Sequence, residues 1–252
     1  FEKILSNKIL KSLDFKLTES QKKVLIEIEN DLNSNKKMFR VIQGDVGSGK
    51  TIVSLLAITN VVESKFQCAL MAPTEILARQ HYELAKRIFK NIKINISFIS
   101  GKTDSKNKKK ILKNLENNKI NLIIGTHSLF QKKIKFKKLG LVVIDEQHKF
   151  GVKQRMDLAK KGGKECDVLL MSATPIPRTM MLTVYGDMDI SKIMEKPLKR
   201  KNIITLSKPE EKIHELWPYL NRQIKNSNQI FWVCPLIEES KILNFSSVEK
   251  RF

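Results

Sequence analysis

Short apolar segments alternate with amphipathic segments along most of the chain. Runs of apolar residues predict strands at 38–43, 67–72, 94–99, 121–124, 141–144 and 167–171. Apolar residues at helical spacing predict helices at 50–63, 75–89 and 104–117. Strands and helices that alternate in this way favour a parallel sheet with helices on both faces, so the chain is predicted to have an α/β fold.

A further helix is predicted ahead of the first strand. Thr18 has the side chain of an N-cap, and Gln21 stands three positions later, where a capping-box partner is needed. Behind them, Val24, Leu25 and Ile28 recur at helical spacing. The helix is therefore predicted to begin just after Thr18.

The pattern changes near residues 195–201, where Pro197 and a group of basic residues are typical of a connector. A helix at 209–224 and a strand at 229–233 then look like the opening of another α/β unit. We therefore expect three parts: a first domain at 1–192, a linker at 193–208 and an incomplete second domain at 209–252.

Charge raises a functional hypothesis without establishing it. The chain has 47 basic and 26 acidic residues and a net charge of +21, which is typical of proteins with a polyanionic partner such as nucleic acid. Lysine, isoleucine and asparagine are all abundant, and an AT-rich coding sequence would produce that trio without selection for binding. The Lys-rich stretches at 106–110 and 132–138 are accordingly interpreted as solvated faces.

Other features limit the class of protein. Three cysteines stand far apart without CxxC spacing, which argues against a disulfide framework or a structural zinc site and favours reduced thiols in the cytoplasm. No apolar run reaches the ~20 residues of a membrane span. The chain begins with Phe1 rather than Met and has no signal peptide, so we expect both of its ends to be cuts in a longer polypeptide.

Residues 44–51 read Gly-Asp-Val-Gly-Ser-Gly-Lys-Thr, which fits the P-loop pattern between a predicted strand and a predicted helix. Glycines let the backbone wrap tightly, so that its N–H groups point at phosphate oxygens. The lysine can reach the β- and γ-phosphates, the threonine hydroxyl can ligate Mg²⁺, and the helix start adds its positive dipole. The predicted ATP-binding residues are Gly44, Gly47, Ser48, Gly49, Lys50 and Thr51.

Two adjacent carboxylates, Asp145 and Glu146, follow the predicted strand at 141–144. Ligands bind at the carboxyl ends of strands in a sheet of this kind. We predict that Asp145 holds Mg²⁺ together with Thr51, and that Glu146 orients or deprotonates the attacking water. With Lys50, these carboxylates are the predicted catalytic groups of a nucleotidase.

Longer sequence words resemble a known family. Residues 145–148, Asp-Glu-Gln-His, resemble the DExH box of superfamily 2 helicases, and residues 171–174, Met-Ser-Ala-Thr, resemble their third motif. Residues 72–81 resemble motif Ia. The extended words at 145–155, 171–179, 183–187 and 234–240 are similar to the RecG family of branch-migrating helicases. The transcription-repair coupling factor shares Pro-Ile-Pro-Arg-Thr at 175–179 and is the nearest alternative.

The resemblance covers residues 15–240 and implies roles that the patterns alone do not give. It implies a RecA-like P-loop NTPase fold and an ATP- and Mg²⁺-dependent bacterial motor in the cytoplasm, associated with the nucleoid, that acts on branched DNA in repair and recombination. It implies that Gln21 reads adenine, although a capping-box side chain is the alternative and both can hold. Gln147 and the catalytic His148 would lie between the γ-phosphate and the third motif.

The resemblance also implies a DNA-facing set. For His127 a simple turn histidine is the alternative, and for Arg178 a local salt bridge is the alternative. The residues that would contact DNA or couple it to ATP are Thr74, Arg79, Gly101, Lys102, Thr126, His127, Ser172, Thr174 and Arg178.

Members of this family complete the ATPase site with a second RecA-like domain, whose late Gln-x-x-Gly-Arg-x-x-Arg motif supplies an arginine finger. They also carry an N-terminal wedge domain. The sequence contains neither, so we expect this chain to bind ATP weakly, to hydrolyse it slowly if at all, and not to unwind DNA. A P-loop kinase or other small-molecule nucleotidase, and a non-catalytic nucleic-acid-binding module, are the alternatives from other classes.

Overall fold

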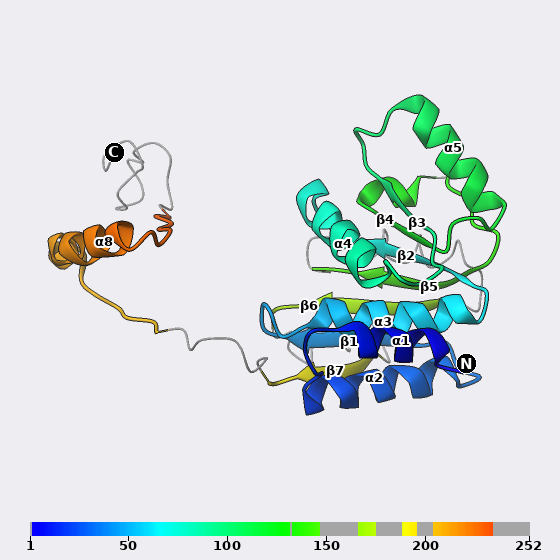
Figure 1. Ribbon diagram of the computed structural model, residues 1–252, viewed down its shortest axis with the longest axis horizontal. Coiled ribbons are helices and arrows are strands. Elements are labelled where there is room, and N and C mark those ends of the chain that lie inside the picture. The colour runs from blue at the N-terminus through cyan, green and yellow to red at the C-terminus, as the bar shows by residue number, and fades with distance from the viewer. Residues whose placement is uncertain (1, 132, 147–165, 175–187, 196–203, 234–252) are drawn as a thin grey trace. The chain divides into compact units, whose positions relative to one another are not determined.

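The computed structural model describes residues 2–131, 133–146, 166–174, 188–195 and 204–233 (Figure 1). The chain divides into two compact units, residues 1–200 and 201–252, and each is treated by itself. The predicted boundaries at 192 and 208 stay a prediction, because the limits of the functional domains are not tested by this division. Within the described residues, no helix has the length and apolar character needed to cross a membrane.

A seven-stranded sheet forms the centre of the first unit, in the order β3-β4-β2-β5-β6-β1-β7. All of its strand pairs are parallel, as the alternation of strands and helices predicted. The strands are β1 (Phe39–Gly44), β2 (Gln67–Met71), β3 (Ile96–Ile99), β4 (Leu122–Gly125), β5 (Leu139–Ile144), β6 (Asp167–Ser172) and β7 (Asp189–Ile193).

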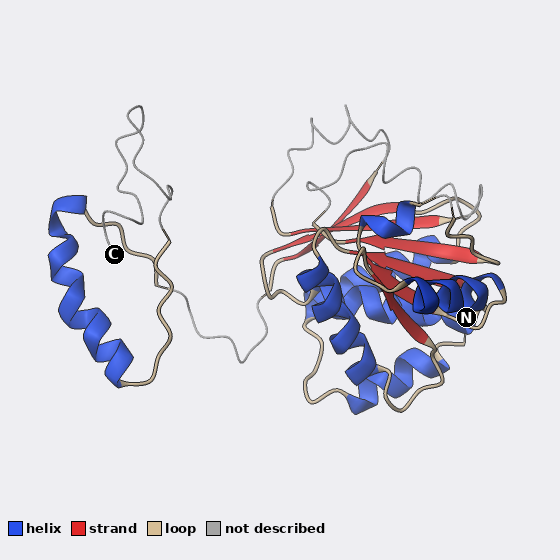
Figure 2. Ribbon diagram, turned by 90° about the horizontal axis from the view of Figure 1, so that it is seen from above, coloured by secondary structure: helices blue, strands red, loops and turns tan. Residues whose placement is uncertain are grey.

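Helices cover both faces of this sheet (Figure 2). One face packs against α2 (Glu19–Leu32), α3 (Lys50–Glu63) and α4 (Glu75–Ile88), and α1 (Ile4–Ser12) packs on α3 in the same core. The other packs against α5 (Ser105–Glu116) and the 3-10 helix η1 (His127–Phe130). Alternate strand residues enter the two cores: Leu70 and Val143 face α3, whereas Ala69 and Val142 face the opposite side. Because both faces are buried, the strands are apolar runs rather than alternating segments.

Most predicted elements are confirmed to within two residues, but in the described part of the first unit helix α1 and strand β7 were missed, as was the short 3-10 helix η1. Helix α1 was not predicted in residues 1–15; its first backbone N–H groups, at Ile4 and Leu5, donate to the Glu63 carboxylate, a partner that lies far along the chain. Strand β7 was also missed, since only Ser191 and Ile193 of its five residues are buried. Both elements are short and are fixed by tertiary contacts.

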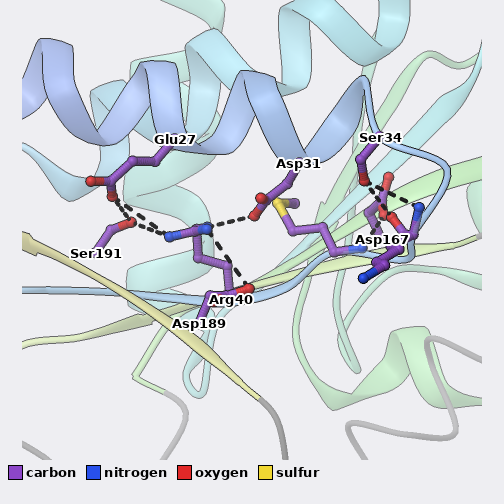
Figure 3. Close-up of polar contacts among 9 residues, drawn as sticks. Glu27, Asp31, Ser34, Arg40, Asp167, Asp189 and Ser191 are labelled. Carbon is purple, nitrogen blue, oxygen red and sulfur yellow. Dashed lines mark hydrogen bonds and ion pairs between the residues drawn. The ribbon is translucent and has the colours of Figure 1, made fainter.

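Strand β7 is tied to the sheet by a polar cluster around Arg40 of β1 (Figure 3). The Arg40 guanidinium donates through Nε to Asp31 Oδ2 at 2.6 Å and through Nη1 to Ser191 Oγ at 2.8 Å. Glu27 accepts a short hydrogen bond from Ser191 and lies 3.6 Å from Arg40 Nη1. Asp189 Oδ2 lies 3.8 Å from Nη2. One planar cation therefore joins α2, β1 and β7.

The second unit differs from its prediction. A 3-10 helix η4 (Glu210–Glu215) precedes α8 (Leu216–Lys225), in place of one helix over 209–224. Pro218 lies in the first turn of α8, where its ring is tolerated; farther inside a helix it would clash with the carbonyl four residues earlier. The predicted strand at 229–233 is wrong, because those residues form no strand. A strand needs a hydrogen-bonded neighbour, and residues 204–233 contain none.

Candidate nucleotide-binding and coupling site

The phosphate loop connects β1 to α3, as the P-loop pattern predicted. Gly47 and Gly49 have φ angles of 76° and 91°, in the left-handed region that favours glycine. Gly49 is also the N-cap of α3. A Cβ atom at Gly49 would lie 2.3 Å from Gln21 Nε2, so a side chain there would be strained and would also displace Gln21. The loop therefore requires glycine at this position on two grounds.

Gln21 contacts the phosphate loop directly. Its Nε2 donates to the Ser48 carbonyl at 2.7 Å, and its Oε1 accepts the Thr18 N–H at 3.0 Å. The Thr18 hydroxyl accepts the Gln21 N–H in return, so the predicted capping box is confirmed. Gln21 is buried, so water competes little for these hydrogen bonds. Adenine reading by Gln21 stays a prediction.

The Lys50 side chain folds back onto the first residues of the phosphate loop. Its Nζ donates to the carbonyls of Gly44 at 2.6 Å and Asp45 at 3.1 Å. Burial lowers the pKa of Lys50 below its ordinary value, while the carboxylates of Asp145, Glu146 and Asp45 act in the opposite direction. The ammonium group therefore lies within the electrostatic reach of both predicted catalytic carboxylates.

Asp145 and Glu146 follow the carboxyl end of β5, as predicted. Asp145 is buried, its N–H donates to the Met71 carbonyl at 2.8 Å, and its Oδ1 accepts the Glu146 N–H at 3.0 Å. Glu146 has a φ of 47°, which is uncommon for a residue other than glycine. The turn after β5 therefore holds the two carboxylates in a constrained conformation.

His81 of α4 is a neighbour of Asp145 that was not predicted as a site residue. Its Nε2 lies 2.7 Å from Asp145 Oδ2, and both side chains are buried. The motif Ia word at 77–81 ends on this histidine, but its pairing with a residue 64 positions away has no sign in the sequence.

The third motif lies between the phosphate loop and the carboxylate pair, because β6 separates β1 from β5 in the sheet. Ser172 is paired with Gln43 in the sheet register, and Gln43 Nε2 donates to the Thr174 carbonyl at 3.2 Å. The Ser172 hydroxyl donates to the same carbonyl at 3.1 Å. Ser172 and Thr174 are therefore connected to the strand that leads into the phosphate loop.

A cavity of about 460 Å³ opens beside the loop, lined by Phe15, Gln21, Gly49, Thr51 and Arg87, among others. It combines an aromatic ring, a guanidinium group and an amide next to the phosphate loop. Phe15 and Arg87 are lining residues that were not predicted, since neither belongs to the phosphate-loop or carboxylate motifs.

A family model described as DEAD/DEAH box helicase matches residues 18–182. The chain belongs to the DEAD/DEAH box helicase family. It is 47% identical over 248 residues to the ATP-dependent DNA helicase RecG of Thermotoga maritima, covering 98% of this chain and 32% of that protein. It is 44% identical over 252 residues to RecG of Aquifex aeolicus, covering 100% of this chain and 32% of that protein. The chain therefore spans about a third of the length of these relatives.

Solved structures agree with this family. A structure of RecG bound to a three-way DNA junction has a TM-score of 0.79 and 43% sequence identity, covering 89% of this chain and 30% of that one. The DEAD-box helicase Mss116, bound to single-stranded RNA, has a TM-score of 0.67 at 22% identity, covering 89% of this chain and 51% of that one. The second comparison shows the helicase fold alone.

In this helicase-family chain, the predicted DNA-facing residues of the first unit follow the carboxyl ends of β2, β3 and β4. Thr74 caps α4 by accepting the Leu77 N–H at 3.3 Å. Arg79 is exposed, pairs with Glu75 at 3.4 Å and lies over the Phe98 ring. Gly101 and Lys102 are exposed after β3.

The next strand contributes the remaining pair of this set. Thr126 is buried ahead of η1, and His127 is exposed. The residues after these three neighbouring strands therefore share one edge of the sheet, and DNA contact at that edge stays a prediction. Gln147, His148 and Arg178 lie outside the described residues.

Helix α5 presents a basic face next to this edge. Lys106, Lys109, Lys110 and Lys113 are exposed at i, i+3, i+4 and i+7, and within the described residues none of them makes an ion pair. Like charges at i,i+4 destabilise a helix by about 0.2–0.5 kcal/mol per pair, so the lysine face carries an uncompensated cost. The remaining α5 lysine, Lys108, donates to Gln131 Oε1 beside η1 at 2.9 Å.

Proposed function

We propose that this chain is the nucleotide-binding part of an ATP- and Mg²⁺-dependent DNA motor that remodels branched DNA, such as stalled replication forks and Holliday junctions, in repair and recombination. The observation that carries the proposal is the convergence of three motifs at one sheet edge. The phosphate loop follows β1, the third motif follows β6, and the carboxylate pair follows β5, and these strands are neighbours in the sheet.

The nucleotide half rests on the phosphate loop and the adjoining cavity. Backbone N–H groups at the start of α3 and the Lys50 ammonium would bind the phosphates. The cavity would take the adenine base, with Gln21 at its inner wall and Phe15 providing an aromatic surface. Since Gln21 already contacts Ser48, base and phosphates would be recognised by one connected structure.

The oxygen-rich residues fit a magnesium ion. Mg²⁺ prefers carboxylate, hydroxyl, phosphate and water oxygens. Asp145 would hold it directly or through water, with the Thr51 hydroxyl at the start of α3 and the phosphates of ATP as further ligands. When bound, the ion neutralises charge on the phosphates. Glu146 would orient the attacking water, and His148 would couple the presence or absence of the γ-phosphate to the third motif.

The DNA half rests on the neighbouring edge of the sheet. Thr74, Arg79, Gly101, Lys102, Thr126 and His127 would contact the backbone, with Ser172, Thr174 and Arg178 coupling those contacts to ATP. Threonine and lysine side chains, backbone N–H groups and helix starts are the usual phosphate contacts. Thr74 and Lys102 expose their side chains, whereas Thr126 is buried and would contribute its backbone. The choice of branched DNA rests on similarity to RecG, one structure of which holds a three-way junction.

The remaining parts of the proposal concern context. A complete motor would need the arginine finger of a second RecA-like domain and a wedge domain, and these would be supplied by other parts of the same polypeptide. The domain limits at 192 and 208, and a bacterial cytoplasmic location at the nucleoid, belong to the same proposal.

Binding of a fluorescent ATP analogue tests the nucleotide half. The chain is expected to bind it in the presence of Mg²⁺, and Lys50→Ala is expected to weaken that binding at least 10-fold while the exposed Lys90→Ala has no effect. ATPase rates then test the DNA half, on this chain and on one extended through a complete second domain, with and without forked DNA. DNA stimulation of the extended chain alone supports the proposal; binding without any DNA response would favour a plain nucleotidase.

A further inference from the structure

We infer that His81 is a positioning residue that orients the magnesium-binding carboxylate of Asp145 and connects it to the helix that starts at the predicted DNA edge. The inference rests on the proposed function, and in particular on Asp145 as a ligand of Mg²⁺. Its basis is the 2.7 Å contact between His81 Nε2 and Asp145 Oδ2. His81 is 7% exposed and Asp145 is 8% exposed, so water competes little for this contact.

The contact fixes the half of the carboxylate that the backbone leaves free. Asp145 Oδ1 accepts the Glu146 N–H at 3.0 Å, whereas Oδ2 is met by His81. A carboxylate accepts but does not donate, so the imidazole carries its proton on Nε2. With both oxygens engaged, rotation of the carboxylate is restricted, and each oxygen keeps a lone pair for a metal-bound water. Partners behind metal ligands orient them in this way.

Histidine suits this position chemically. An imidazole protonated on Nε2 donates a hydrogen bond without needing a positive charge. A lysine or arginine at the same place would neutralise the carboxylate and reduce its attraction for a cation. Among the histidines in the described part of the chain, His127 and His214 are exposed and His81 is buried. Its face of α4, shared with Ala78 and Ala85, is the face packed on the sheet.

Helix α4 gives the contact a second consequence. The helix begins after Thr74 and carries Arg79, both predicted to face DNA, and His81 lies two residues beyond Arg79. The main chain of Asp145 is held by the Met71 carbonyl, at the end of the strand that leads into this helix. The backbone and the side chain of Asp145 therefore both form hydrogen bonds with one continuous segment, residues 71–81. If DNA binding moves that segment, it would change the orientation of the Asp145 carboxylate.

The test measures the affinity of the chain for a fluorescent ATP analogue as a function of Mg²⁺ concentration. His81→Leu introduces an apolar side chain of similar size and removes the donor; His81→Gln keeps an N–H donor at a comparable reach. His214→Leu is the matched control, since it removes an exposed histidine from the second unit. Thermal unfolding of each variant checks that the fold is kept.

We expect His81→Leu to raise the Mg²⁺ concentration needed for half-maximal binding about 10-fold, with Mg²⁺-free binding unchanged, and His81→Gln to restore most of the affinity. A His81→Leu chain with wild-type Mg²⁺ dependence would overturn the inference. So would a folded His81→Gln chain as defective as His81→Leu, because the hydrogen bond would then not matter. If the unmodified chain binds no nucleotide, the proposed function fails, and the inference falls with it.

Discussion

The Gln21 side chain joins helix α2 to the phosphate loop through its Nε2, which donates to the Ser48 carbonyl at 2.7 Å. Its Oε1 accepts the Thr18 N–H at 3.0 Å in the same conformation. One amide thus closes the helix cap and supports the loop that is proposed to hold phosphate. A nucleotide bound at Gly49 would therefore also affect the first turn of α2, through Gln21.

Two substitutions separate these contacts of Gln21. Gln21→Glu keeps an oxygen that can complete the capping box but loses the N–H that reaches Ser48; Gln21→Ala loses both. We expect both to weaken binding of a fluorescent ATP analogue about 10-fold, equivalent to ~1.4 kcal/mol. Only Gln21→Ala removes the oxygen that accepts the Thr18 N–H, which costs about 1 kcal/mol of stability, while the Thr18 hydroxyl still caps the backbone N–H of residue 21. Gln21→Glu instead places a carboxylate at a buried position, where its charge would also affect stability. Its unfolding is therefore measured at about pH 5 and about pH 7, to separate the effect of the charge from that of the lost N–H. Unchanged nucleotide affinity in both would show that the Ser48 contact is irrelevant to binding.

The lysine face of α5 is expected to contact the DNA backbone. Replacing Lys106, Lys109, Lys110 and Lys113 with glutamine should reduce the magnitude of the slope of log affinity against log salt concentration for duplex DNA by about 3.6, because each of the four lost phosphate contacts reduces it by ~0.9. Fluorescence anisotropy over a salt series provides the measurement.

A matched variant removes the same charge elsewhere. Lys8, Lys11, Lys16 and Lys23, on or near α1 and α2, are exposed, and in the described structure they make no ion pair. Their replacement by glutamine should change the slope by less than about 1. Equal losses in the two variants would mean that net charge alone attracts DNA and that the α5 face has no special part.

We expect the Arg40 side chain to contribute strongly to the free energy of unfolding of the first unit. Arg40→Met leaves the carboxylates of Glu27 and Asp31 without their shared cation and should reduce the free energy of unfolding by about 2–3 kcal/mol, below the 3–5 of a fully buried pair because these carboxylates are partly exposed. Arg40→Lys should recover only part of this, since one ammonium cannot meet Asp31 and Ser191 in the same fork geometry.

Chemical denaturation measures these changes. Arg79→Met serves as the control, because Arg79 is exposed, and its surface ion pair with Glu75 and its contact with the Phe98 ring are each worth about 1 kcal/mol or less. An Arg40→Met chain no less stable than the control would show that the cluster in Figure 3 contributes nothing net.

Asp167 gives the fold a pH dependence with a defined sign. Burial raises the pKa of Asp167 to about 6 from its ordinary 3.8, although the carboxylate accepts the Met38 N–H at 2.7 Å. Because the folded chain holds this proton more tightly than the unfolded chain, the stabilising contribution is complete below about pH 4 and is lost as pH rises through about 6.

Asp167→Asn keeps an oxygen for Met38 and removes the charge. It should raise the free energy of unfolding at pH 7.5 by about 1 kcal/mol, a value reduced because water screens a partly exposed carboxylate, and should leave it unchanged near pH 4. Denaturation at both pH values provides the measurement. A gain of the same size at pH 4 would assign the effect to packing rather than to ionisation.

Local patterns in the sequence were sufficient for much of this protein. The capping box of Thr18 and Gln21, the phosphate loop ending at Thr51 and the carboxylates after β5 were all predicted, because each depends on neighbours within a few residues. The apolar runs of β2 and β5 likewise identified buried strands of a parallel sheet. The second unit was predicted less well, since a strand at 229–233 needs a partner that residues 204–233 do not offer.

Tertiary structure decided which distant residues meet. His81 and Asp145 are 64 positions apart, Arg40 and Ser191 are 151 apart, and Gln21 and Ser48 are 27 apart. No local spacing rule encodes such pairs, because they depend on the order in which parallel strands join and on which helix face packs against them. The sequence by itself determined the chemical groups and the local turns that present them. Only the packed sheet decided that a buried histidine would lie 2.7 Å from the carboxylate proposed to bind magnesium.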